Sequence, residues 1–339
     1  MNSSGIILTL AYPETIVRVS DEWFVNYLKF FGIGTKNYVR AGHAALVLIN
    51  TENGNLDYYD FGRYIIPAPY GRVRSKITDN ELNFPIQVNL DNGKIKNLND
   101  ILHFLATNPK LTHGEGKMLA SVCNDVDYNK AKTYIEKLQE RYFVPYGVFR
   151  KNGSNCSRFV TSTLIESVTD KNIRNKLKRL TWFTPSTIGN VVLSSSDNMI
   201  YEVSDIGEIS EFTSSSRKEN IKYFLDSLKE FTPNFVGNLK QKTVHGITRN
   251  AQWLGGIGAG AWFELHKTDN LNEYIFRRIS PYGHTDVEDV FVVEELLFNY
   301  NEPYEFLHHS NCSFLHIKQH NRIYKFERKQ NLVQRKRST

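Results

Sequence analysis

The sequence predicts an α+β fold in two domains: an N-terminal domain in which a cysteine-bearing helix packs against an antiparallel sheet, and a C-terminal β-rich domain. Two observations support this prediction. Helical and strand patterns alternate in the first half of the chain, whereas one helix and then a series of alternating strands follow residue 196. The 339 residues also exceed what one hydrophobic core usually organises. We expect domains over residues 1–195 and 196–327, and a basic, disordered tail over 328–339.

The N-terminal domain is expected to begin with an apolar strand in the first ten residues and a helix over 21–31, which two glycines end. Strands over 42–50 and 56–64 flank Asn53-Gly54, and this dipeptide between alternating apolar runs is a strong signal for a β-hairpin. The remaining predicted elements are strands over 84–90 and 118–123 and helices over 98–105, 128–142 and 171–180.

The domain boundary is expected at Ser194-Ser195-Ser196-Asp197, where small polar residues interrupt an apolar pattern. A helix over 217–229 follows. The glycines at 255, 256, 258 and 260 do not have the spacing of a dinucleotide-binding motif, so we expect a flexible approach to a strand. The predicted strands of this domain span 261–266, 274–279, 287–293, 304–308, 313–318 and 322–327.

Cys156 is the candidate nucleophile, because the sequence predicts that it lies in the first turn of a helix. The preceding turn is signalled by Lys151-Asn152-Gly153-Ser154, and the helix by apolar residues at helical spacing after Cys156. Unpaired backbone N–H groups and the helix dipole favour a thiolate at such a position. The alternative is a buried structural cysteine, but the polar residues on both sides of Cys156 favour the catalytic interpretation.

His43 is the candidate base. Antiparallel pairing around the Asn-Gly turn brings it opposite residues 62–64, and the alternation of side chains puts Tyr58 and Asp60 on its face of the sheet. A carboxylate at Asp60 would fix the tautomer and orientation of the imidazole. The alternatives are that His43 is a core histidine, that Asp60 caps a turn or pairs with the nearby arginine, and that Tyr58 or Tyr64 is the third partner.

These motifs resemble the papain-like NlpC/P60 superfamily in its circularly permuted branch, to which lecithin retinol acyltransferase and its relatives belong. Gly42-His43-Ala44 opens a strand, and Asn155-Cys156-Ser157-Arg158-Phe159-Val160 is similar to the cysteine-helix signature of that branch. The resemblance covers the N-terminal domain and implies a cysteine that forms a thioester and cleaves or transfers an acyl group. The branch often has a second histidine on the partner strand, where this chain offers Asp60 or a tyrosine.

The sequence therefore predicts a cysteine peptidase or amidase that acts on a peptide or acyl-amide substrate. Cys156 would attack the carbonyl, its backbone N–H would hold the oxyanion, and His43 would protonate the leaving group. An acyltransferase on the same fold and a non-catalytic binding module with a vestigial cysteine are the alternatives. The C-terminal domain is expected to bind substrate or a protein partner. Three arginines after the hairpin could bind a substrate anion, unless they are solvated loop residues: Arg63, Arg72 and Arg74.

Composition limits the other possibilities. Three widely spaced cysteines favour a reducing cytoplasm over a disulfide framework. No run approaches the roughly 20 apolar residues of a membrane span, and the N-terminus has no signal-peptide features. The net charge of +6 comes partly from the tail, and no nucleic-acid-binding motif accompanies it, so we expect no nucleic-acid partner. We expect no cofactor and no metal, because a hairpin would scatter the candidate zinc ligands His309, Cys312 and His316.

Overall fold

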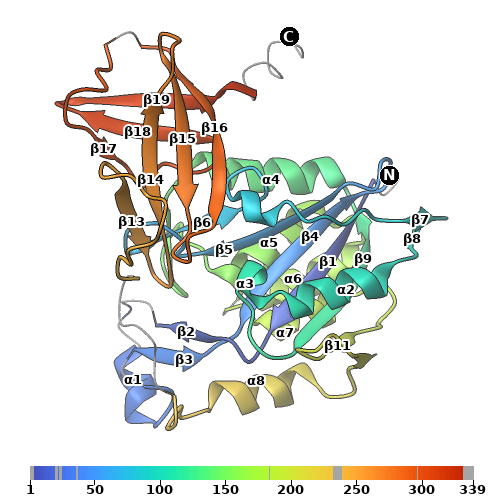
Figure 1. Cartoon of the computed structure of the whole chain (residues 1–339). Helices are drawn as coiled ribbons and strands as arrows, with labels where there is room; N and C mark the ends of the chain where they lie inside the picture. The colour runs from blue at the N-terminus through green and yellow to red at the C-terminus, as the bar shows by residue number, and fades with distance from the viewer. Residues whose placement is uncertain are drawn as a thin grey trace. The chain divides into compact units, whose positions relative to one another are not determined.

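The chain forms two compact units (Figure 1). The first unit comprises Met1–Gly62 and Phe84–Thr232, and the second comprises Arg63–Asn83 and Pro233–Thr339. The computed structural model describes residues 4–19, 22, 25–35, 37–182, 184–231, 239–295 and 297–330.

An antiparallel sheet forms the centre of the first unit. Its strands are β1 (Gly5–Tyr12), β4 (His43–Asn50), β5 (Leu56–Gly62), β9 (Met118–Val126), β11 (Tyr201–Val203) and β12 (Ile209–Glu211). Their order is β5-β4-β1-β9-β11-β12. Every residue of β1 is buried, because this strand is covered on both faces and paired on both sides. The register joins Tyr12 to His43 and Ala45 to Asp60.

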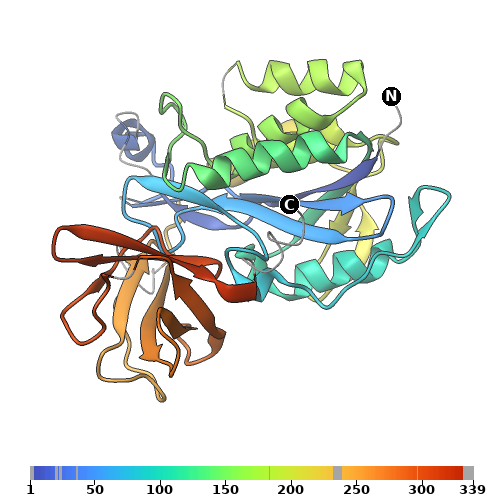
Figure 2. The same ribbon diagram turned by 90° about the horizontal axis from the view of Figure 1, so that it is seen from above.

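Helices cover both faces of this sheet. Figure 2 shows α4 (Tyr128–Glu140), α5 (Cys156–Ser167) and α6 (Lys171–Leu180) on one side and α2 (Leu98–Thr107) on the other. The helix α5 packs against β4 and β5, and α7 (Thr187–Ser194) packs against β1 and β9. The other elements of this unit are α1 (Val25–Phe30), α3 (Pro109–Thr112), α8 (Ser216–Phe224) and the short strands β2 (Ile16–Arg18), β3 (Tyr38–Arg40), β7 (Leu90–Asp91), β8 (Lys94–Ile95) and β10 (Val144–Pro145).

The second unit contains a curved antiparallel sheet. Its strands are β13 (Gln252–Gly256), β14 (Ala259–Lys267), β15 (Glu273–Ile279), β16 (Thr285–Val293), β17 (Glu305–Phe306), β18 (Phe314–Gln319) and β19 (Arg322–Arg328), in the order β13-β14-β15-β16-β19-β18-β17. The Gln252 amide bridges the two edge strands, because it donates to the Tyr304 carbonyl (2.8 Å) and accepts from the Phe306 N–H (2.9 Å). The sheet is thereby nearly closed into a barrel around an aromatic core that includes Phe263, Phe276, Phe291, Phe306 and Phe326.

The buried Arg278 ties the segment 63–83 to this sheet within the second unit. This segment contains β6 (Tyr70–Arg74) and a short 3-10 helix, η1 (Asn80–Leu82). The Arg278 guanidinium contacts three carboxylates: Glu81 at 2.7 Å, Asp286 at 3.0 Å and Asp79 at 3.2 Å. Burial alone would raise the pKa of Asp79, but the charges of Arg72 and Arg278 hold this pKa well below its usual range.

The predicted fold class is confirmed: the chain is α+β, with a cysteine-bearing helix packed on an antiparallel sheet and a β-rich C-terminal part. The prediction of a strand over 84–90 is wrong, because only Leu90 of this segment is in a strand. The apolar pattern there has another cause, since Phe84 packs against the rings of Tyr58 and Phe104, with centroids 5.4 and 5.0 Å apart. The helix predicted over 21–31 corresponds to α1, and Asp21, Trp23 and Phe24 lie outside the described residues.

Several elements were not predicted, among them α7 and β13. The helix α7 follows the Thr-Pro-Ser turn, where the Ser186 hydroxyl caps it by accepting from the Gly189 N–H. The strand β13 contains two of the glycines that were expected to be flexible. Gly256 is required there because a Cβ would lie 2.4 Å from the Ile65 nitrogen, so the glycine permits close approach of two backbones.

The division into units differs from the boundary predicted at residues 194–197. Residues beyond it extend the first sheet, because β11 pairs with β9. The segment 63–83 groups instead with the second unit, through Arg278 and the burial of Ile65 in the aromatic core. Arg328, predicted to begin the tail, ends β19 and contacts Asp289 at 2.7 Å. Residues 331–339 lie outside the described residues.

Candidate active site

Cys156 is the first residue of α5. The side chain of Asn155 caps this helix, because its Oδ1 accepts a hydrogen bond from the Arg158 N–H at 2.8 Å. The backbone N–H groups that precede this bond have no acceptor within the helix, so they are available beside the sulfur. Cys156 is buried, with 8% of the residue exposed.

His43 begins β4, directly across from the end of β1. Its Nε2 lies 3.4 Å from Oδ2 of Asp60, which comes from the neighbouring strand β5. The contact is electrostatic rather than a well-directed hydrogen bond, since Nε2 has no such partner among the described residues. The hairpin therefore brings the imidazole and the carboxylate to the same face of the sheet, as the side-chain alternation indicates.

The His43 ring interacts with both other candidate residues. Burial alone would lower the pKa of His43, but the neighbouring Asp60 and Cys156 outweigh burial and raise it to about 9. The imidazole thus lies 3.4 Å from the Asp60 carboxylate, and Cys156 is close enough to influence its pKa. Imidazolium is the main form of His43 at neutral pH.

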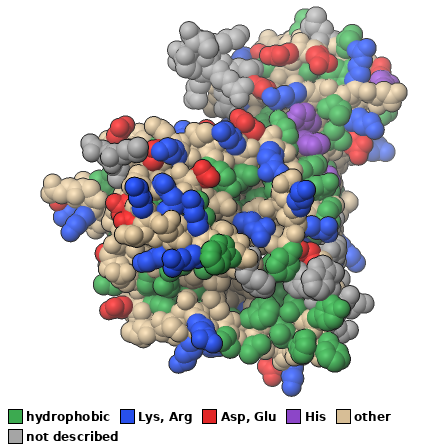
Figure 3. All heavy atoms as spheres, turned by 180° about the vertical axis from the view of Figure 1, so that it is seen from behind, with side chains coloured by type: hydrophobic (Ala, Val, Ile, Leu, Met, Phe, Trp, Pro, Cys, Tyr) green, Lys and Arg blue, Asp and Glu red, His purple; other side chains and the backbone are tan. Residues whose placement is uncertain are grey.

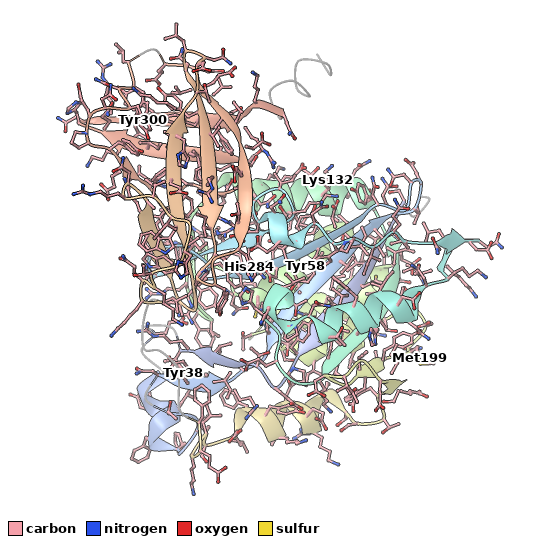
Figure 4. The ribbon with its side chains drawn as sticks, in the orientation of Figure 1. Tyr38, Tyr58, Lys132, Met199, His284 and Tyr300 are labelled. Carbon is pink, nitrogen blue, oxygen red and sulfur yellow. The ribbon has the colours of Figure 1, made fainter. Side chains whose placement is uncertain are left out.

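Asp60 is completely buried and has a second partner in Tyr58. The Tyr58 hydroxyl lies 3.1 Å from Asp60 Oδ2 and 3.2 Å from the Thr112 carbonyl. A hydroxyl has one proton to donate, and an ionised carboxylate is the stronger acceptor. Tyr58, labelled in Figure 4, projects from β5 in the sheet of the first unit. It therefore contacts the carboxylate rather than replacing it beside His43.

Tyr12 is a neighbour of the site that the sequence analysis missed. Its ring stacks beside the His43 ring, with centroids 6.3 Å apart, and its hydroxyl donates to the Leu105 carbonyl at 3.3 Å. Gly114 packs directly over the Tyr12 ring, where a Cβ would lie 2.1 Å from the nearest ring carbon. The signal in the sequence was the tyrosine at the end of an apolar strand, but its proximity to His43 depends on the pairing of β1 with β4.

The predicted anion-binding arginines belong to the second unit, where they have other partners. Arg72 binds Asp79 bidentately, at 2.6 and 2.7 Å, and Arg74 is buried with its guanidinium 4.0 Å from the centre of the Tyr64 ring. Arg63 is half-buried, and its carbonyl accepts from the Ile257 N–H. Their role in substrate binding stays a prediction. For Arg72 to bind a substrate anion, its ion pair with Asp79 would first have to break.

The other two cysteines, Cys123 and Cys312, are buried. Burial raises the pKa of the Cys123 and Cys312 thiols to about 12, which makes them unreactive near neutral pH. All three cysteines are free. No cluster that could hold a metal ion occurs in the described part of the chain. The His309 and His316 rings meet edge to face, with their centroids 5.7 Å apart.

Two family models match the chain. The model described as "Type VI secretion system effector TseH-like" matches residues 7–173, a range that includes His43, Asp60 and Cys156. The first unit is therefore similar to the TseH-like effectors. The model described as "DUF6695 C-terminal domain" matches residues 251–329, which include the whole curved sheet of the second unit.

One solved structure is similar to the chain. It is the crystal structure of the Type VI secretion system effector TseH, with 17% identity and a TM-score of 0.41 over 62% of this chain and 99% of that chain. No curated protein matches the chain by sequence. Across the described residues, none of the helices combines the length and the apolar character that crossing a bilayer requires.

Proposed function

We propose that the protein is a cysteine hydrolase, a peptidase or amidase, with Cys156 as nucleophile, His43 as general acid and base, and Asp60 as the residue that orients His43. The observation that supports this proposal is an imidazole 3.4 Å from a fully buried carboxylate, with a pKa that is also influenced by Cys156 at the start of α5. Such an arrangement supplies a nucleophile, a group that carries the proton and a group that orients the proton carrier.

The raised pKa of His43 indicates how the reaction starts. The positive charge of the imidazolium and the N-terminus of α5 would stabilise the negative charge that develops on the sulfur as it attacks a carbonyl carbon. The oxyanion would accept a hydrogen bond from the Cys156 N–H. His43 would then give its proton to the leaving amine, and the resulting thioester would be hydrolysed by water that His43 deprotonates.

The similarity to TseH-like effectors supports a further proposal, that the chain is an effector of a Type VI secretion system. An effector of a secretion system acts after export, so the cytoplasm predicted from the cysteine content would be its place of synthesis. The permuted NlpC/P60 topology remains part of the proposal, supported by the order of His43 before Cys156. For the second unit we propose binding of a substrate or protein partner.

Acylation by p-nitrophenyl acetate tests the hydrolase. We expect a burst of p-nitrophenol and, by mass spectrometry, one acetyl group on Cys156 that water removes. The Cys156→Ala variant should give no burst, and the variants Cys123→Ala and Cys312→Ala should behave as wild type, because both of these thiols are buried and protonated. Absence of the acyl-enzyme would contradict the proposal. An acyl-enzyme that decays only with an added amine or alcohol would indicate the acyltransferase instead.

A further inference from the structure

A cavity of about 400 Å³ lies within the first unit, between α4, α5 and the loop that leads to Cys156. It is distinct from the triad, because none of the candidate catalytic residues lines it. Its lining is mainly polar and comes from Tyr134, Leu138, Arg141, Val144, Asn152, Gly153, Ser154, Arg158 and Ser162.

The lining carries two positive charges and no negative charge. Arg141 comes from the end of α4 and Arg158 from the first turn of α5. Among the described residues neither arginine has a carboxylate partner; Arg141 donates to the Asn152 carbonyl at 3.1 Å and Arg158 to the Val148 carbonyl at 2.5 Å. Each guanidinium has five N–H groups, so most of its donors remain for a ligand.

The surroundings strengthen this positive field. Figure 3 views the side of the first unit that carries α4 and α6, and Lys and Arg side chains are numerous on it. The helix α6 alone contributes five of them: Lys171, Arg174, Lys176, Lys178 and Arg179. Glu166 acts electrostatically on Tyr134, but Glu166 is exposed and does not line the cavity. An anion entering the cavity would therefore meet two guanidinium groups and no carboxylate in the lining.

The floor of the cavity is a turn with a fixed shape. Asn152 adopts a left-handed conformation with φ of 54°, and a Cβ on Gly153 would lie 2.6 Å from the Pro145 carbonyl oxygen. Ser154 is buried, and its N–H donates to the same Pro145 carbonyl. A rigid, concave and positively charged site is suited to a small ligand with a planar or tetrahedral anionic group.

We propose that this cavity binds a small ligand through a phosphate or carboxylate group held by Arg141 and Arg158. Because the two arginines also hold the loop that ends at the Asn155 cap, the ligand stabilises the conformation from which Cys156 begins its helix. The site is a second binding site of the first unit and does not depend on the chemistry proposed for Cys156.

Ligand binding to the full chain tests this proposal, with inorganic phosphate and acetate as the probes and sodium chloride to keep ionic strength constant. We expect a saturable rise in the midpoint of thermal unfolding with one or both probes. Phosphate alone would indicate a phosphorylated ligand, and acetate alone a carboxylate. The Cys156→Ala variant should respond as wild type, which separates this site from the catalytic proposal.

Charge-neutralising variants locate the site. Arg141→Gln, at an exposed position, should weaken phosphate or acetate binding about tenfold or more, because it removes a charge-assisted hydrogen bond. Arg158→Gln should do the same. Lys137→Gln is the matched control, since it removes one charge from an exposed position of α4 outside the lining and should leave binding unchanged. No saturable shift in wild type, or equal weakening by Lys137→Gln, would overturn the proposal.

Discussion

His43 and Asp60 come from neighbouring antiparallel strands and meet with Nε2 3.4 Å from Oδ2, although Asp60 pairs with Ala45, two residues after His43. The carboxylate is fully buried, and His43 is 6% exposed. A buried carboxylate beside an imidazole favours the imidazolium.

Stability should depend on the titration of His43. The folded pKa of about 9 lies above the ordinary value of 6.5, so the stabilisation is fully present below pH 6.5 and is lost as the pH rises through 9. We expect the difference in unfolding free energy between wild type and His43→Gln to shrink over this window. Urea denaturation at pH 6, 7.5 and 9.5 measures it. A difference that is constant with pH would contradict the ion pair.

Tyr58→Phe should slow acylation of Cys156 by about three- to tenfold, because Asp60 loses a hydrogen bond that fixes it and orients His43 less well. The control is Tyr59→Phe, since Tyr59 is buried on the opposite face of the same strand. The burst rate with p-nitrophenyl acetate is the measurement. Equal rates in the two variants would show that the Tyr58 hydroxyl does not position the site.

Asn155→Ala should destabilise the first unit by about 1 kcal/mol, which is typical for loss of a helix N-cap. Asn155→Asp keeps an acceptor for the Arg158 N–H, so its stability should remain close to that of wild type. Denaturant unfolding monitored by circular dichroism compares the two. If alanine and aspartate have the same effect, the cap does not hold the start of α5.

Arg278→Met should destabilise the second unit by about 3–5 kcal/mol, because Glu81 and Asp286 lose the cation that they contact and the buried Asp79 keeps only Arg72. Lys325→Met is the control. It removes an exposed ion pair with Glu327 and should cost no more than about 1 kcal/mol. Differential scanning calorimetry measures the stability of both variants. A small effect of Arg278→Met would mean that segment 63–83 is held by its apolar contacts instead.

Local patterns were sufficient for the parts of the site that depend on one element. The Asn53-Gly54 turn predicts the register that puts Asp60 on the face of His43, and Gly54 has the positive φ of 69° that such a turn needs. The polar turn before Cys156 likewise predicts the capped helix. These features need only residues that are close in the sequence.

Features that join distant residues could not be predicted. Tyr12 reaches His43 only through the pairing of β1 with β4, and the turn at Thr112 reaches Tyr58 across 54 positions. The segment 63–83 belongs to the second unit because Arg278, about 200 residues later, binds its carboxylates. A periodicity of apolar residues describes one element at a time and contains no information on such partners.

The most direct test of the account is the rate at which iodoacetamide alkylates Cys156 as a function of pH. If Cys156 is the nucleophile and His43 its partner, alkylation at pH 6 should be fast and confined to Cys156, and its rate should change little towards pH 8. The rate at pH 6 should fall greatly in His43→Ala. Slow alkylation at pH 6 that is the same in wild type and His43→Ala, or is shared with Cys123 and Cys312, would contradict these roles.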